Sequence, residues 1–115
     1  MKPATYREAA LAMPEEELED NVLQLAKLLG WVAVHHRPAR TADGGWRTAI
    51  KGQKGFPDLV LARDGQVLFR ELKRQKGKPT AEQEIWLEAL GDFGGIWRPQ
   101  QWLDGTIQSE LRRTR

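Results

Sequence analysis

Apolar residues change their spacing several times along this chain, and the changes divide it into helical and extended segments. Between Pro14 and Gly30, three successive glutamates open an amphipathic pattern that predicts a helix, with apolar residues at helical spacing at Leu18, Val22, Leu25 and Leu29. Gly30 is expected to end this helix. Residues 31–37 (WVAVHHR) are apolar and then polar, which predicts a strand entering a sheet.

Two further apolar runs, residues 57–63 and 66–73, are expected to form a hairpin. The dipeptide Asp64-Gly65 separates them, and this pair suits a tight two-residue turn between antiparallel strands. The sequence therefore predicts two paired strands in the middle of the chain.

Three ionisable residues of this hairpin are expected to form a site. Asp58 lies at the start of its first strand, and Glu71 and Lys73 lie near the end of the second. Strand alternation turns Glu71 and Lys73 to the same face as Val67 and Phe69, and we expect that face to be the buried one. A buried carboxylate costs several kcal/mol unless it is paired or coordinates a cation.

The second half of the chain predicts one more helix and one more strand. Thr80-Ala81-Glu82-Gln83 has the pattern of a capping box, which opens a helix through Leu90. A short strand over residues 96–98 and a tail with helical spacing over residues 100–115 follow. The order of elements predicts a single α/β domain with a mixed central sheet flanked by helices, and residues 1–13 form a helical turn or a loose arm.

The amino-acid composition excludes some kinds of covalent link and metal site and indicates a kind of partner. The chain has 115 residues and no cysteine, so disulfides and thiolate metal sites are excluded. No apolar run approaches the roughly 20 residues of a membrane span, and we expect a cytoplasmic protein. Residues 1–30 carry three basic and six acidic side chains, whereas the remainder carries 15 basic and 10 acidic ones, a distribution that would suit a polyanionic partner.

The basic residues gather in two segments beside the predicted site. Residues 38–55 form the longest stretch without predicted structure and surround Trp46 with cations, so they either contact DNA or form a solvated loop. The turn after the hairpin is also basic. The candidate DNA-binding residues of the two segments are Arg40, Arg47, Lys51, Lys54, Arg74, Lys76 and Lys78.

Two carboxylates and an ammonium group can support hydrolysis of a phosphodiester bond. Carboxylate oxygens are hard ligands that suit Mg²⁺ or Mn²⁺, and a lysine can orient the attacking water or stabilise developing charge. Adjacent His35 and His36 face opposite ways on a strand, so they cannot easily bind one ion, and we interpret them as strand-end or substrate-contact residues.

The spacing of these residues resembles a known signature. Pro57-Asp58 followed by Glu71-Leu72-Lys73 resembles the PD-(D/E)xK motif of the restriction-endonuclease-like nucleases. Within that superfamily, the segments GFPDLVL, VLFRELKRQKGKPTAEQ and the following Trp-Leu resemble the VRR-NUC family, over roughly residues 15 to 107. The resemblance implies a restriction-endonuclease-like core.

The resemblance also implies roles for individual residues. Asp58, Glu71 and the main-chain carbonyl of Leu72 would hold Mg²⁺ or Mn²⁺, and Lys73 would position or activate the water. An acidic residue of the first long helix, Glu19 or else Glu15, would complete the ligands. Gln83 has two interpretations, since it either returns a hydrogen bond to Thr80 within the capping box or faces the active site.

The function implied by this resemblance is a metal-dependent, structure-specific endonuclease, and stand-alone members of the family resemble Holliday-junction resolvases. A two-fold homodimer would match the two symmetric strands of a four-way junction. Two alternatives stay open: a flap or single-strand nuclease acting as a monomer, and a catalytically silent DNA-binding module. Silent relatives usually lose the Asp, Glu or Lys of the motif, and Asp58, Glu71 and Lys73 are all present.

Overall fold

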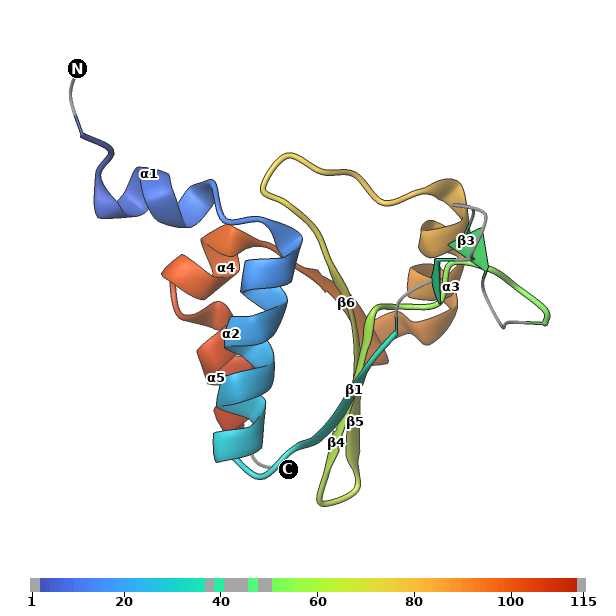
Figure 1. The fold of residues 1–115 in the computed structure, drawn as a ribbon. Helices are drawn as coiled ribbons and strands as arrows, with labels where there is room; N and C mark the ends of the chain where they lie inside the picture. Colours follow the sequence, from blue (N-terminus) through green and yellow to red (C-terminus); the bar gives the residue numbers. More distant parts are fainter. Residues whose placement is uncertain (1–2, 37–38, 41–45, 48–50, 114–115) are drawn as a thin grey trace.

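The computed structural model describes residues 3–36, 39–40, 46–47 and 51–113, and it confirms the α/β class with a mixed sheet flanked by helices (Figure 1). The elements in chain order are α1 (Tyr6–Leu11), α2 (Glu15–Leu28), β1 (Val32–His35), β2 (Ala39–Arg40), β3 (Trp46–Arg47), β4 (Leu59–Arg63), β5 (Gln66–Leu72), α3 (Ala81–Leu90), the 3-10 turn η1 (Gly91–Phe93), β6 (Gly94–Trp97), α4 (Pro99–Leu103) and α5 (Thr106–Arg112).

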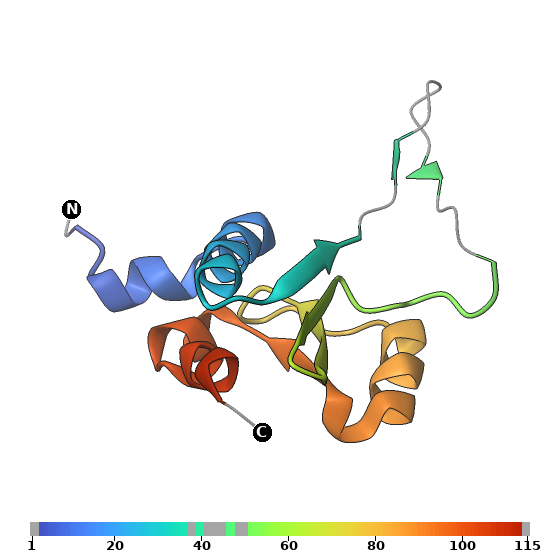
Figure 2. The same ribbon diagram turned by 90° about the horizontal axis from the view of Figure 1, so that it is seen from below.

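The main sheet has the strand order β1-β4-β5-β6. β1, β4 and β5 pair antiparallel, whereas β5 and β6 are parallel. Parallel neighbours require a crossover connection, and here the basic turn and α3 provide it. Helices α2, α4 and α5 lie on one side of the sheet and α3 on the other, while β2 and β3 form a separate ladder (Figures 1 and 2).

The predicted hairpin between β4 and β5 is confirmed. Asp64 and Gly65 both have positive φ angles, 50° and 80°, as a tight two-residue hairpin turn requires. The turn pairs Arg63 with Gln66 and, further along, Leu59 with Arg70.

The core lies between the sheet and the helices α2 and α5. β4, β5 and β6 turn Leu59, Leu61, Leu72 and Trp97 toward this layer, and all four side chains are buried. The helices contribute the opposite side of the core with Leu18, Val22, Ala26, Ile107 and Leu111. Of the apolar stripe expected on α2, Leu18 and Val22 are therefore core residues, and Leu25 and Leu29 pack at its margin.

The face of β5 that was expected to be buried does bury Glu71, but the hydrophobic core lies on the other face. Val67 and Phe69 are only half-buried, and the well-packed core lies on the opposite face with Leu72. The reason is that β5 is a central strand, covered on both faces, and the short helix α3 covers only part of the face that carries Glu71.

Of the two alternatives for residues 1–13, the helical one is found, because α1 packs against α4 with Arg7 Nη2 3.3 Å from Gln100 Oε1. Two other segments differ from expectation. The stretch expected to lack structure contains the paired strands β2 and β3. The tail forms two helices instead of one, separated at Asp104 and Gly105.

The helices were also compared with the length and hydrophobicity that a membrane span requires. Within the described part of the chain, no helix is both long enough and apolar enough to span a bilayer.

Gly55 offers a test of how the segment before Asp58 is placed. Its φ angle is +91°, and an added Cβ would lie 2.4 Å from the main-chain carbonyl carbon of Glu82 in α3. We predict that Gly55→Ala lowers the free energy of unfolding in urea by roughly 2 to 4 kcal/mol, because backbone strain and a main-chain clash coincide.

Gly52→Ala is the matched control for this change. Gly52 also has a positive φ angle, +108°, but none of the residues that the structure describes lies within 4 Å of the added Cβ. Only the strain of the left-handed backbone remains, about 1 to 2 kcal/mol. Equal losses for the two variants would contradict the proposed close contact with α3.

Candidate functional site

The hairpin register sets two carboxylates opposite each other. Leu59 pairs with Arg70, so the next position along each strand places Asp58 opposite Glu71. One oxygen of Asp58 accepts a hydrogen bond from the main-chain N–H of Leu72 at 3.0 Å, and the carbonyl of Asp58 accepts one from His36 at 2.8 Å. Like charges directly opposite in a sheet destabilise it, so this pair needs compensation.

Glu71 is the most enclosed carboxylate of the site, with 2% of its surface exposed. Gln83 Nε2 donates to its Oε1 at 2.8 Å, and the ammonium nitrogen of Lys73 lies 3.8 Å from the same oxygen. Its second oxygen, Oε2, is buried and, among the described residues, makes no hydrogen bond of good geometry. Asp58 acts on the same carboxylate in two ways: its main-chain hydrogen bond lowers the pKa of Glu71, and its carboxyl group raises it.

Burial raises the pKa of Glu71 to about 8, and the neighbouring Asp58 carboxylate adds to the rise through a shared hydrogen bond and through charge repulsion. Lys73 acts in the opposite direction, but its effect is smaller. Near neutral pH the pair either retains a proton between its two carboxylates or requires a cation. The tendency of the Asp58–Glu71 pair to bind a proton or a cation is the property on which the chemistry of the site depends.

Gln83 forms the expected capping box and also contacts Glu71. Its backbone N–H donates to Thr80 Oγ1 at 3.1 Å, and its own Oε1 accepts from the Thr80 N–H at 2.9 Å, which completes the expected capping box. Its remaining amide nitrogen is then directed to Glu71. The start of α3 is thereby coupled to the buried carboxylate.

A cavity of about 320 Å³ opens beside Asp58. Glu19 of α2 is 8% exposed at its wall, and its Oε2 lies 2.7 Å from Nε2 of His35 at the end of β1. The structure thus brings Glu19 to the sheet, as expected from its place on α2. The full lining consists of Glu15, Glu16, Glu19, His35, His36, Asp58 and Leu72.

The two carboxylates fit part of a divalent-cation site. Among the described residues, no group of three or more His, Asp or Glu side chains is arranged to hold a metal ion. Asp58 and Glu71 nevertheless meet the chemical requirement, because both supply carboxylate oxygens and a cation beside them would relieve the repulsion between them. Glu19, the candidate from α2, contacts His35 through one of its two carboxylate oxygens.

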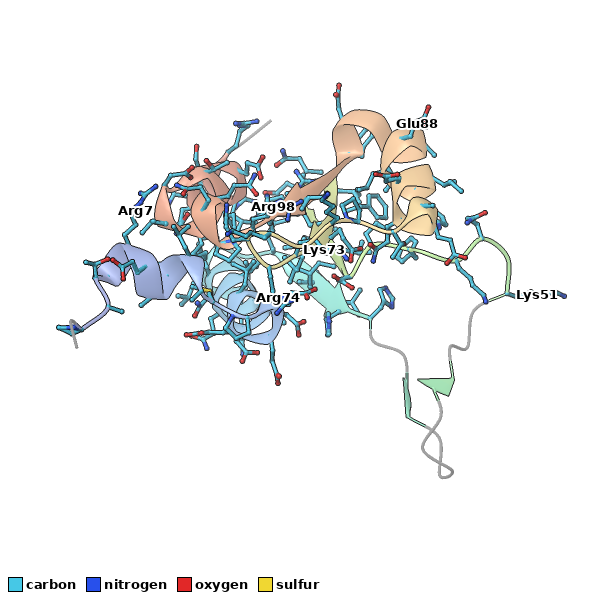
Figure 3. The ribbon with its side chains drawn as sticks, turned by 90° about the horizontal axis from the view of Figure 1, so that it is seen from above. Arg7, Lys51, Lys73, Arg74, Glu88 and Arg98 are labelled. Atoms are coloured by element: carbon cyan, nitrogen blue, oxygen red, sulfur yellow. The ribbon has the colours of Figure 1, made fainter. Side chains whose placement is uncertain are left out.

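The expected DNA-binding residues fall into two groups. Arg74, Lys76 and Lys78 are exposed on the turn that follows Lys73, whereas Lys51 and Lys54 are exposed on the segment before Asp58. Figure 3 shows Lys73 and Arg74 near the centre of the molecule and Lys51 at its far end. The side chains of Arg40 and Arg47 lie outside the described part of the chain.

Two features of the site were missed in the sequence. His35 was expected only as a strand-end or substrate-contact residue, whereas its Nε2 contacts Glu19 of α2, a contact that depends on how α2 docks on the sheet. Phe56 contacts Trp86 and Phe69, with ring centroids 4.9 Å and 6.0 Å apart, and anchors the chain just before Asp58. The sequence signal for Phe56 was only its position beside the Pro-Asp pair.

Comparison with family models, curated proteins and solved structures finds no match to this chain. The chemistry of the site is therefore inferred from its own geometry.

The raised pKa of Glu71 predicts an unusual dependence of stability on pH. A carboxyl group with a higher pKa in the folded state binds its proton more tightly there, so stability is present at low pH and is lost as the pH rises from about 4.5 toward 8. In protein freed of divalent ions, we expect the Tm to fall over this range and Glu71→Gln to reduce the fall. A Tm profile in Glu71→Gln that follows that of the unmodified chain would contradict this assignment.

Proposed function

We propose that this chain is a metal-dependent endonuclease that hydrolyses phosphodiester bonds in DNA. The observation that carries the proposal is the pairing of the half-buried Asp58 with the buried Glu71: their carboxylates are set face to face, and burial together with Asp58 raises the pKa of Glu71. A site built only for stability would not retain two opposed carboxylates, because burying them costs several kcal/mol without an evident structural return.

Asp58, Glu71 and the Leu72 carbonyl would hold Mg²⁺ or Mn²⁺, with Glu19 as the candidate ligand from α2. When bound, the ion would polarise a phosphoryl oxygen and lower the pKa of a nearby water. The role of the protein is to hold the carboxylates in place. Gln83 fixes one oxygen of Glu71, and the Leu72 N–H fixes one oxygen of Asp58.

Lys73 is the candidate group for orienting the attacking water. Its ammonium lies 3.8 Å from Glu71 and is mostly buried, so it stands beside the carboxylate pair without neutralising it fully. A cation in this position can hold a water against the phosphate and stabilise the charge that develops during in-line displacement.

A branched DNA substrate and a homodimer are the finer parts of the proposal. In the sheet register Val34, Val60 and Phe69 lie on the same face as Glu71. On that face Val32 is 76% exposed, and Phe93, beside α3, is 61% exposed. An exposed apolar surface supports association with a second copy, and a two-fold dimer would present paired sites to the two symmetric strands of a four-way junction.

The test is cleavage of labelled four-way junction, 5′-flap, single-stranded and duplex DNA in Mg²⁺ or Mn²⁺. We expect paired symmetric incisions in the junction, and a loss of about 10²-fold or more in the cleavage rate with Lys73→Ala. Lys27→Ala serves as the control, because Lys27 is exposed on α2. Cutting only of flaps or single strands would replace the substrate assignment, and no metal-dependent cutting of any DNA would favour a silent binding module.

Gln83→Glu separates the helix cap from support of the site. A glutamate at this position still accepts the hydrogen bond from Thr80, but it cannot donate to Glu71 and it adds a negative charge. We expect unchanged helix content by circular dichroism and a cleavage rate lower by about 10- to 100-fold at fixed Mg²⁺, as for other residues that orient metal ligands. A rate equal to that of the unmodified chain would remove Gln83 from the proposed site.

A further inference from the structure

Residues 74–78, the turn between β5 and α3, are hydrogen-bonded through their main chain to one arginine that follows β6. Nη1 of Arg98, the residue after β6, donates to the main-chain carbonyl of Arg74 at 2.9 Å and also to that of Gly77. The N–H of Gly77 in turn donates to the Arg74 carbonyl at 3.0 Å, which closes the turn. A single guanidinium thus binds both ends of the bend.

A second anchor fixes the middle of the same turn. Oε1 of Gln75 accepts a hydrogen bond from the main-chain N–H of Gln100 at 2.9 Å, in the first turn of α4. Gln75 and Gly77 are half-buried, whereas the residues that alternate with them, Arg74, Lys76 and Lys78, are exposed. The anchoring residues therefore face the protein, and the three cations face away from it.

This arrangement leaves the three cations available to a partner. Among the described residues, none of them forms an ion pair with a carboxylate. They follow Lys73 directly along the chain, and Figure 3 shows Lys73, Arg74 and Arg98 gathered in one region. Fixing the turn in advance removes part of the ordering cost that a flexible basic loop would pay on binding.

We propose that residues 74–78 form a preorganised clamp for the sugar-phosphate backbone of a nucleic acid, and that Arg98 is its positioning residue. Regularly spaced phosphates suit a row of outward-facing cations, and such contacts position a strand without reading its sequence. The proposal rests on the proposed function, since the bound strand would be the one delivered to Lys73 and Glu71.

The test measures binding of a fluorescein-labelled oligonucleotide, single-stranded and duplex, by anisotropy in EDTA over a series of salt concentrations. Arg98→Lys keeps the charge but shortens the side chain by one atom, so its nitrogen no longer reaches the place of Nη1, which binds both carbonyls, and Arg112→Lys, at an exposed position of α5, is the matched control. We expect Arg98→Lys to weaken binding about tenfold and to reduce the salt slope, as expected when preformed phosphate contacts are lost, and Arg112→Lys to change neither. Unchanged binding in Arg98→Lys would overturn the positioning role.

Lys76→Gln keeps the proposal testable if Arg98→Lys fails to fold. Lys76 is exposed, so its replacement should leave the Tm unchanged and lower the slope of log K against log salt by about 0.7 to 0.9, the value of one lost phosphate contact. Lys27→Gln on α2 should leave the slope unchanged. An unchanged slope in Lys76→Gln, or equal displacement of the oligonucleotide by poly-glutamate, would overturn the clamp.

The two proposals fail in different ways. Binding that depends on Arg98 and Lys76, without metal-dependent cutting, would keep the clamp and remove the nuclease. Cutting that requires Lys73 but is indifferent to Arg98 and Lys76 would keep the nuclease and overturn the clamp.

Discussion

The two-residue turn at Asp64 and Gly65 is the constraint on which the rest of the structure depends. Because both residues adopt positive φ angles, the hairpin closes with a single register. A slip by one residue would turn Leu59 and Leu61 out of the core and separate Asp58 from Glu71. The same turn therefore determines both the packing of the sheet against α2 and the pairing of the two carboxylates.

The site occupies the margin of this packed sheet, where main-chain groups and polar side chains share the task of holding it. The Leu72 N–H binds Asp58, while the Leu72 side chain belongs to the core. Gln83 similarly joins the cap of α3 to Glu71. Since each of these residues has a structural partner as well as a site partner, the geometry of the site is fixed by the fold itself.

Local patterns revealed much of this from the sequence. The hairpin and the capping box depend on neighbouring residues, so they were predicted correctly, and the proximity of Asp58 to Glu71 followed from strand pairing. Contacts between distant elements could not be derived in this way. The pairing of His35 with Glu19 depends on how α2 docks on β1, and the support that Arg98 gives to the basic turn depends on where β6 ends. The face of the sheet that carries the hydrophobic core was not predicted, because β5 has apolar residues on both of its faces.

The hairpin also has a consequence for the order of folding events. β4 and β5 are joined by a two-residue turn, so their pairing is local, whereas Gln83 comes from α3, in the longer connection that leads to β6. A hairpin that closes first brings Asp58 opposite Glu71 before the Gln83 amide is in place. The carboxylates of Asp58 and Glu71 then repel each other before the chain has finished folding. A bound proton or a dissolved cation is the first group that can reduce this repulsion.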